Sequence, residues 1–218
     1  AIVPGIELVF LCDPNNPTGR LMDEGLLYRV LERCRQVGAM LAVDQCFLEL
    51  SPGEPDRLVR ELEGGGLLLL RALTKSYAMA GLRLGYCLSD DRALLAAMAE
   101  EGPPWPVSQL AQQAGISALQ YAPDWPFRVR QQLEEERRYL SQELSRLRFH
   151  VYPSDSNFLL FQGEEGWRER LLDRGILIRS CADFQGLGPG FYRVCVRSRG
   201  ENKRLIQAIQ QEREAFHG

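Results

Sequence analysis

Short apolar runs alternate with longer amphipathic stretches in the first half of the chain. Residues 23–38 place apolar side chains at helical spacing, with Asp23 able to cap the helix and Gly38 able to end it. Strands that alternate with helices predict an α/β fold with a mostly parallel sheet. The apolar runs of strand length are residues 6–12, 40–43, 67–73 and 83–88, and the runs at 6–12 and 67–73 are predicted to be buried.

After residue 90 the apolar positions recur at helical spacing. The pattern predicts helices from residue 90 and over 108–120, and one long helix over the charged segment 124–147. Helices at 167–174 and 201–216 then alternate with short strands at 151–152, 158–161, 176–178 and 192–196. The predicted organisation is a large domain at 1–122, a connecting helix at 123–148 and a small α+β domain at 149–218.

Composition and charge narrow the partners that such a protein can have. Of its 218 residues, 45% are hydrophobic and 25% are charged, which is typical of a globular protein. The 26 lysines and arginines against 29 aspartates and glutamates give a net charge of −3, which argues against a nucleic-acid partner. The apolar runs are far shorter than the ~20 residues of a membrane span, so no membrane partner is expected.

Cysteine and histidine usage indicates the compartment and argues against a metal enzyme. Six cysteines without a C-x-x-C pair predict reduced thiols and a cytoplasmic protein. Two histidines leave little material for a metal site, so none is expected. A chain that opens directly on a strand and a motif-like loop is unusual for a complete domain, so we expect further residues to precede it.

Polar residues follow two of the predicted strands. Residues 13–19, with the sequence D-P-N-N-P-T-G, predict a rigid turn that leaves amide side chains at the carboxyl end of a strand, where open α/β sheets bind ligands. Asp44 interrupts an apolar run and needs a cation or several hydrogen-bond donors. A plain turn and a structural aspartate are the alternatives at these two places.

A third loop, residues 73–86, carries the most specific signal. Lys75 is predicted to end a strand, and Arg83 follows eight residues later between glycines that allow close backbone approach. A lysine at such a place can bind a carbonyl cofactor covalently. By itself Lys75 could be a surface lysine, but the order Asn, Asp, Lys, Arg at successive strand ends favours one site.

With these motifs, the whole chain resembles the class I/II aminotransferases of pyridoxal-phosphate fold type I. The resemblance implies the C-terminal part of such an enzyme, with the mostly parallel sheet of the remaining large domain and a small α+β C-terminal domain. The resemblance further implies that Asn16 bonds to the phenolic oxygen of pyridoxal 5'-phosphate and that Asp44 pairs with the pyridine nitrogen of the cofactor. Lys75 would then bind the cofactor covalently, and Arg83 would hold its phosphate.

Two positions depart from the most common family pattern. Phe47 stands where many aminotransferases have a tyrosine that also bonds to the phenolic oxygen. Ala72 stands where the family often offers a hydroxyl to the cofactor phosphate, so Thr74 or an upstream loop must compensate. Phe47 and Thr74 are nevertheless counted with the cofactor-binding residues.

The resemblance also indicates the substrate. Arg193 corresponds to the arginine that binds the substrate carboxylate in the family. Asn16 and Asn157 are also expected to bind the substrate. The chain looks most like the branch of histidinol-phosphate aminotransferases and threonine-phosphate decarboxylases. Arg179 corresponds to a position that holds the substrate phosphate in that branch, with a rim arginine as the alternative. A phosphorylated amino acid or amine is therefore the expected substrate, and the full-length enzyme is expected to be a homodimer.

The reaction type stays open between two outcomes. Phe47 and the stretches at 76–79 and 178–181 resemble the threonine-phosphate decarboxylase of cobalamin biosynthesis, and this resemblance favours decarboxylation over transamination. The family's first part, with its glycine-rich phosphate loop and stacked aromatic ring, has no counterpart here, so this stretch by itself is expected to be inactive. The non-enzymatic alternative is a stable fragment or a binding and assembly module.

Overall fold

The computed structural model describes residues 2–217, whose contacts divide the chain into two compact units. Unit 1 contains the residues up to Asn15 and Leu21–Val129, and unit 2 contains Asn16–Arg20 and the residues from Arg130 on. The boundary between Val129 and Arg130 falls inside helix α5 (Trp125–Arg146). The three-part division predicted from the sequence stays a prediction.

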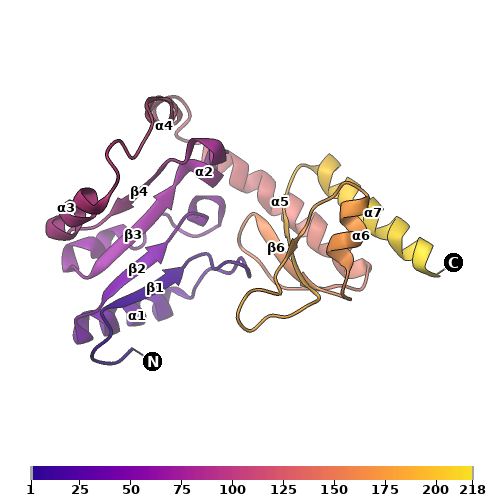
Figure 1. The fold of residues 1–218 in the computed structure, drawn as a ribbon, viewed down its shortest axis with the longest axis horizontal. Helices are drawn as coiled ribbons and strands as arrows, with labels where there is room; N and C mark the ends of the chain where they lie inside the picture. The colour runs from indigo at the N-terminus through magenta and orange to yellow at the C-terminus, as the bar shows by residue number, and fades with distance from the viewer. Residues whose placement is uncertain (1, 218) are drawn as a thin grey trace. The chain divides into compact units, whose positions relative to one another are not determined.

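Unit 1 is built on a four-stranded sheet in the order β1-β2-β3-β4 (Figure 1). Strands β1, β2 and β3 pair in parallel, and β4 pairs antiparallel with β3. Their register aligns Cys12 with Asp44 and Asp44 with Leu70, so the carboxyl ends of the parallel strands lie side by side. The α/β fold with a mostly parallel sheet is confirmed. The strands are β1 (Leu8–Cys12), β2 (Met40–Asp44), β3 (Leu67–Ala72) and β4 (Gly85–Leu88).

Helix α1 (Glu24–Val37) covers one face of this sheet. Asp23 accepts a hydrogen bond from the N–H of Leu26 at 2.9 Å, and Gly38 ends the helix in the left-handed conformation. Its buried side chains pack on alternate residues of β2 and β3, and each fully buried leucine contributes about 1.5–3 kcal/mol relative to exposure. This core comprises Leu27, Leu31, Cys34, Leu41, Val43, Leu67 and Leu69.

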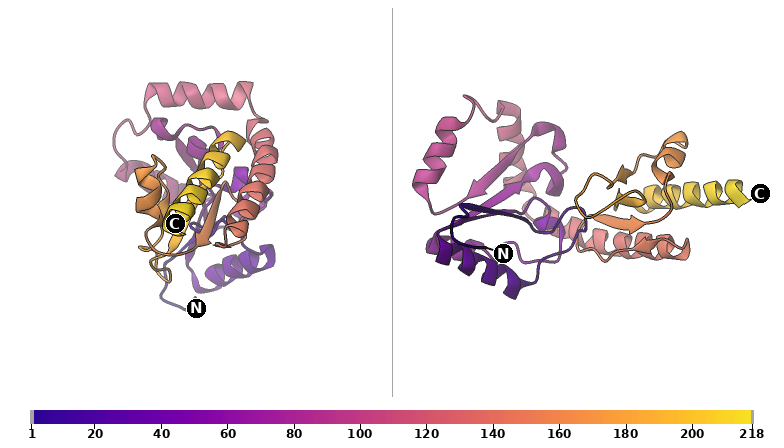
Figure 2. Two further views of the ribbon diagram at one scale, coloured as in Figure 1. Left: turned by 90° about the vertical axis from the view of Figure 1, so that its right-hand side faces the viewer. Right: turned by 60° about the horizontal axis from the view of Figure 1, so that its bottom comes forward.

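The prediction of a fully buried first strand was wrong. Strand β1 begins at Leu8, and the side chains of Leu8 and Phe10 are 57% and 58% exposed. Alternation along a strand turns successive side chains to opposite faces, and these two lie on the face away from the core that α1 covers. Figure 2 shows α1 along one side of the unit 1 sheet.

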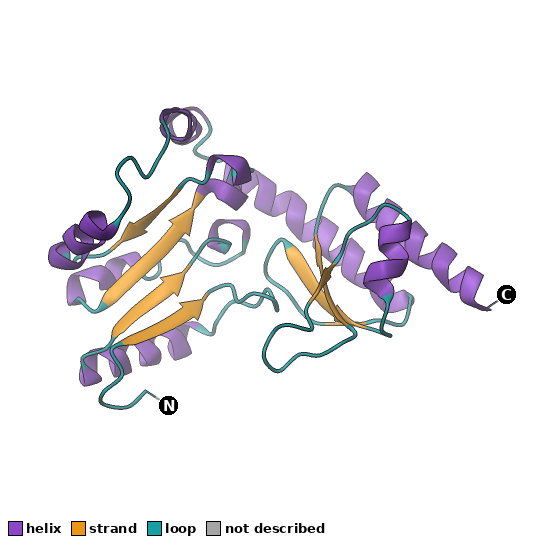
Figure 3. Cartoon of the chain, viewed as in Figure 1, coloured by secondary structure: helices purple, strands orange, loops and turns teal. Residues whose placement is uncertain are grey.

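Shorter elements complete unit 1 (Figure 3). The two 3₁₀ helices after β2 were not predicted, because three to six residues carry too little periodicity. Ser108 caps α4 with a hydrogen bond from the N–H of Ala111, in agreement with the predicted start. These elements are η1 (Leu48–Leu50), η2 (Val59–Gly64), α2 (Leu73–Ser76), η3 (Ala80–Leu82), α3 (Arg92–Glu101) and α4 (Gln109–Tyr121).

Unit 2 is an antiparallel sheet in the order β5-β6-β8-β7, with helices packed on one face. Leu159, Phe161, Tyr192 and Val194 point into the core with α5, α6 and α7. The strand predicted at 176–178 was wrong in its position, because the residues that pair with β8 are Arg179 and Ser180. The further elements are β5 (His150–Val151), β6 (Phe158–Gln162), α6 (Trp167–Asp173), β7 (Arg179–Ser180), β8 (Phe191–Cys195) and α7 (Arg199–His217).

A polar cluster ties α5 to α7. Glu136 accepts hydrogen bonds from Arg199 Nε at 2.9 Å and from Asn202 Nδ2 at 2.9 Å. Burial alone would raise the pKa of Glu136, but these two donors outweigh it and the pKa is lowered. A carboxylate stabilised in this way strengthens the fold as long as it stays ionised.

Glu136→Gln should therefore lower the melting temperature at pH 7 by about 2–4 °C, the shift expected for a loss of about 1 kcal/mol. Because the pKa is lower in the folded state, the stabilisation is full above the unfolded pKa of about 4.3 and is lost as the pH falls through the folded value. Thermal melts of both proteins from pH 7 to pH 3 should converge at the acidic end. Glu135→Gln, one residue away and exposed, is the control. A difference that persists unchanged at pH 3 would contradict the prediction.

Candidate active site

Asp44 lies at the carboxyl end of β2, in the middle of the parallel strands. Its carboxylate is half-buried, and Oδ1 accepts the N–H of Cys46 at 2.9 Å. The backbone N–H of Asp13 donates to the Asp44 carbonyl at 2.9 Å, so the loop that follows β1 begins beside it. The structure thus places the carboxylate at the edge where ligands of α/β sheets bind.

Lys75 lies on the short helix α2 and not at the end of a strand. The prediction of a strand over 67–73 was wrong at its end, because β3 stops at Ala72 and the chain turns into α2. The Lys75 side chain is exposed, and its Nζ lies 5.8 Å from the centroid of the Phe47 ring. Phe47 follows Asp44 by three residues, so unit 1 brings an amine and an aromatic ring to the carboxyl ends of its strands.

Cys46 shares this neighbourhood but is a poor nucleophile. Burial, with a hydrogen bond to Asp44 and the Asp44 charge, raises the pKa of the Cys46 thiol to about 12, although Lys75 opposes the shift. The thiolate is the reactive form of cysteine, and it is scarce at neutral pH when the pKa is this high. The accessible nucleophile here is the amine of Lys75.

Arg83 precedes β4 and does not belong to it. The predicted strand over 83–88 begins only at Gly85, because Arg83 adopts the left-handed conformation with φ at 54°. The N–H of Leu73 donates to the carbonyl of Leu84 at 3.1 Å, which brings the backbone of Arg83 beside the start of α2 and Thr74. Its exposed guanidinium donates to the carbonyl of Ala80 at 3.1 Å.

A buried ion pair at the base of the first loop was missed by the sequence analysis. Asp13 is fully buried, and its carboxylate pairs with Arg57, whose side chain is 7% exposed. The other oxygen of Asp13 accepts the N–H of Met22 at 2.8 Å, which closes the loop 13–22 at its base. The signal for this pair is an acidic residue directly after an apolar run, the same signal that marks Asp44.

In unit 2, Asn16 and Arg193 are in direct contact. The Arg193 guanidinium donates to Asn16 Oδ1 and lies 5.1 Å from the centroid of the Phe158 ring. Arg193 pairs with Leu160 across the sheet, and side chains paired in this way share a face. Because its neighbours Tyr192 and Val194 point into the core, Arg193 lies on the opposite face.

Arg179 is the cross-strand partner of Arg193 on β7, so both guanidiniums stand on the same face. Arg179 is exposed and pairs with Asp183. Asn157 lies just before β6, where its carbonyl accepts the N–H of Val196 at 2.8 Å and its Oδ1 accepts the Ser156 hydroxyl at 3.2 Å. The structure therefore brings together Asn16, Arg179 and Arg193, whereas Asn157 is fixed by contacts of its own.

The family model for aminotransferases of class I and II matches residues 3–209. The chain belongs to this family. Its members are enzymes that depend on pyridoxal 5'-phosphate. In the described residues no helix is long and apolar enough to cross a membrane, and no group of histidine, cysteine and acidic side chains could hold a metal ion.

The chain can be compared with individual members of this family. The chain is 39% identical to the threonine-phosphate decarboxylase of Salmonella typhimurium, aligning over 96% of this chain and 58% of that protein. It is 32% identical to histidinol-phosphate aminotransferase 2 of Archaeoglobus fulgidus, aligning over 94% and 58%. The crystal structure of the histidinol-phosphate aminotransferase from Clostridium acetobutylicum matches with a TM-score of 0.89 and 26% identity, covering 96% of this chain and 64% of that one. The chain thus spans about 58% of the length of the Salmonella decarboxylase and of the Archaeoglobus aminotransferase.

The donor set of unit 1 fits the family's cofactor. An exposed primary amine, Lys75, suits an aldehyde, and a half-buried carboxylate, Asp44, suits a protonated ring nitrogen. The guanidinium of Arg83 and the hydroxyl of Thr74 suit a phosphate. The residues present are therefore chemically matched to pyridoxal phosphate, and their individual roles are proposals.

Proposed function

We propose that the full protein is a pyridoxal-phosphate enzyme that acts on a phosphorylated amino acid, with decarboxylation of O-phosphothreonine as its reaction. When bound, the cofactor supplies an electron sink for the bonds at the substrate Cα. Lys75 holds the cofactor covalently and moves the proton at Cα, and Asp44 keeps the ring nitrogen protonated. Thr74 and Arg83 would bind the cofactor phosphate, and Phe47 would stand at the position where many aminotransferases have a cofactor-binding tyrosine.

The observation that carries the substrate class is the cross-strand pair of Arg179 and Arg193. Two guanidiniums on adjacent strands and the same face match a substrate with two anionic groups. Arg193 binds the carboxylate, together with Asn16 and Asn157, and Arg179 binds the phosphate. A substrate with one anionic group would engage only one of these guanidiniums.

Two observations favour decarboxylation. Identity is 39% to the Salmonella decarboxylase and 32% to the Archaeoglobus aminotransferase. Phe47 has no hydroxyl, and the resemblance associates a phenylalanine at this position with the decarboxylase-like members of the family. Histidinol-phosphate transamination is the second candidate, favoured by the structural match to the Clostridium enzyme. Homodimer formation and a cytoplasmic location rest on the family resemblance and the cysteine pattern, and both stay predictions.

The product of the full-length protein distinguishes the two reactions. With pyridoxal phosphate bound, we expect release of carbon dioxide from O-phosphothreonine, measured with a carboxyl-labelled substrate. Histidinol phosphate with a keto acid is the parallel incubation, and amine transfer is measured by the amino acid formed. Rapid transfer from histidinol phosphate without carbon dioxide release from O-phosphothreonine would assign the protein to the aminotransferases instead.

A further inference from the structure

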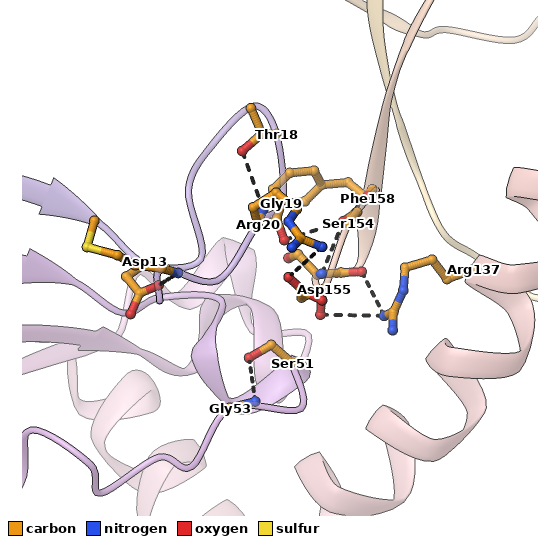
Figure 4. A network of polar contacts seen from close by, with 12 residues as sticks. Asp13, Thr18, Gly19, Arg20, Ser51, Gly53, Arg137, Ser154, Asp155 and Phe158 are labelled. Carbon is orange, nitrogen blue, oxygen red and sulfur yellow. Dashed lines mark hydrogen bonds and ion pairs between the residues drawn. The ribbon is translucent and has the colours of Figure 1, made fainter. Parts of the chain in front are cut away.

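Two loops of unit 2, residues 16–20 and 154–157, are joined by a hydrogen bond and an ion pair. The N–H of Asp155 donates to the carbonyl of Gly19 at 2.8 Å, and the Arg20 guanidinium lies 3.5 Å from the Asp155 carboxylate. Figure 4 shows these residues from close by. Because Asn16 begins the first loop and Asn157 ends the second, one set of contacts fixes two residues that the proposed function assigns to the substrate.

Gly19 allows this close approach. Its φ is +73°, a conformation that residues with a side chain rarely adopt, and a Cβ atom there would lie 2.1 Å from Ser154 Oγ and 3.3 Å from Phe158 Cε2. The backbone of the first loop therefore lies directly on Ser154 and Phe158. The same Phe158 ring lies beneath the Arg193 guanidinium, which bonds to Asn16.

Arg137, on helix α5, supports the second loop. Its Nη1 donates to the carbonyl of Ser156 at 3.1 Å and lies 3.5 Å from the carbonyl of Asp155. Burial lowers the pKa of Arg137, and the nearby Asp155 carboxylate opposes the shift. A half-buried guanidinium that donates to backbone carbonyls fixes the path of a loop, because both groups lose water and are satisfied only in this conformation.

Ser154 closes the same loop from inside. Its hydroxyl donates to the carbonyl of Phe158 at 2.6 Å and accepts the N–H of Ser156 at 3.1 Å. Arg137 thus ties the loop to helix α5, and the hydroxyl of Ser154 ties it to Phe158, the first residue of β6. The adjacent Arg138 differs, because it is exposed and pairs with Glu134 on its own helix at 3.2 Å.

We propose that Arg137 is a positioning residue for substrate recognition. By fixing residues 154–157 it holds Gly19 through the N–H of Asp155, and Gly19 in turn sets where Asn16 meets Arg193. Arg137 acts through these residues and is assigned no contact with the substrate. This inference rests on the proposed function, since it gives Arg137 a part in binding the carboxylate that Arg193 holds.

Arg137→Lys in the full-length, cofactor-loaded protein tests this role, because lysine keeps the charge but loses the planar fork. We expect KM for O-phosphothreonine to rise roughly tenfold, the effect of losing a hydrogen bond from a charged group, with kcat changing less. Amide hydrogen exchange, measured without substrate, should be roughly tenfold faster in peptides that cover 16–20 and 154–157 and unchanged in helix α1. The matched control Arg138→Lys should leave KM and exchange as in the wild type.

Two results would overturn the proposal: identical kinetics and exchange in the two lysine variants, or a lower melting temperature with KM unchanged. If Arg137→Lys does not fold, Ser154→Ala decides by the same measurements, since it removes one hydroxyl and loosens the same loop. If the wild-type protein converts neither phosphorylated substrate, the proposed function fails. The exchange comparison still decides whether Arg137 orders the two loops.

Discussion

Replacing Lys75 with alanine should abolish covalent binding of pyridoxal phosphate and lower kcat by roughly 10³-fold or more. The variant lacks both the amine that binds the cofactor aldehyde and the group that moves the proton at the substrate Cα. Borohydride reduction of the wild-type protein, followed by peptide mapping, should place the cofactor on Lys75. Absorbance of the bound cofactor, followed during titration of both proteins, provides the second measurement.

The sequence offers an unusually sharp control for this experiment. Lys75 and Lys203 are its only lysines, and Lys203 lies exposed on α7 in unit 2. Lys203→Ala should bind the cofactor and turn over like the wild type. A cofactor label on Lys203, or a Lys75→Ala protein that keeps its activity, would remove Lys75 from the proposed site.

The parts of the site that lie close in sequence to a strand end could be predicted. Asp44 interrupts an apolar run, and a carboxylate at such a place needs a partner whatever the rest of the fold does. The position of Lys75 was predicted less well, since β3 was expected to continue to residue 73. Four residues of helix α2 carry no detectable period, so the pattern of hydrophobic residues could not show where the strand stops.

Contacts between distant residues could not be predicted from local patterns. Asn16 and Arg193 are 177 positions apart, and Asp13 and Arg57 are 44 apart. Nothing in the neighbouring sequence specifies these partners, because strand order and loop paths bring them together. The exposure of Phe10 has a similar cause, since an apolar run reveals strand length but not which faces of the sheet are covered.

Arg179→Lys should separate recognition of the substrate phosphate from recognition of its carboxylate. Lysine keeps the positive charge but cannot form the paired hydrogen bonds of a guanidinium with a phosphate. We expect kcat/KM for O-phosphothreonine to fall about 10²-fold, with little change for threonine, which has no phosphate. The Asp183 carboxylate does not prevent this role, because an ion pair between exposed side chains contributes little and can exchange for a stronger anion.

Arg193→Lys provides the contrasting result, because its cross-strand neighbour Arg179 is left intact. If Arg193 binds the carboxylate that both substrates share, its replacement should lower kcat/KM for O-phosphothreonine and threonine by similar factors. The ratio of the two substrates is then the decisive quantity, since a general loss of folded protein lowers both values and leaves the ratio unchanged. Equal losses for both substrates in Arg179→Lys would show that Arg179 is a rim residue without a phosphate-binding role. The cross-strand arginine pair would then no longer support a phosphorylated substrate.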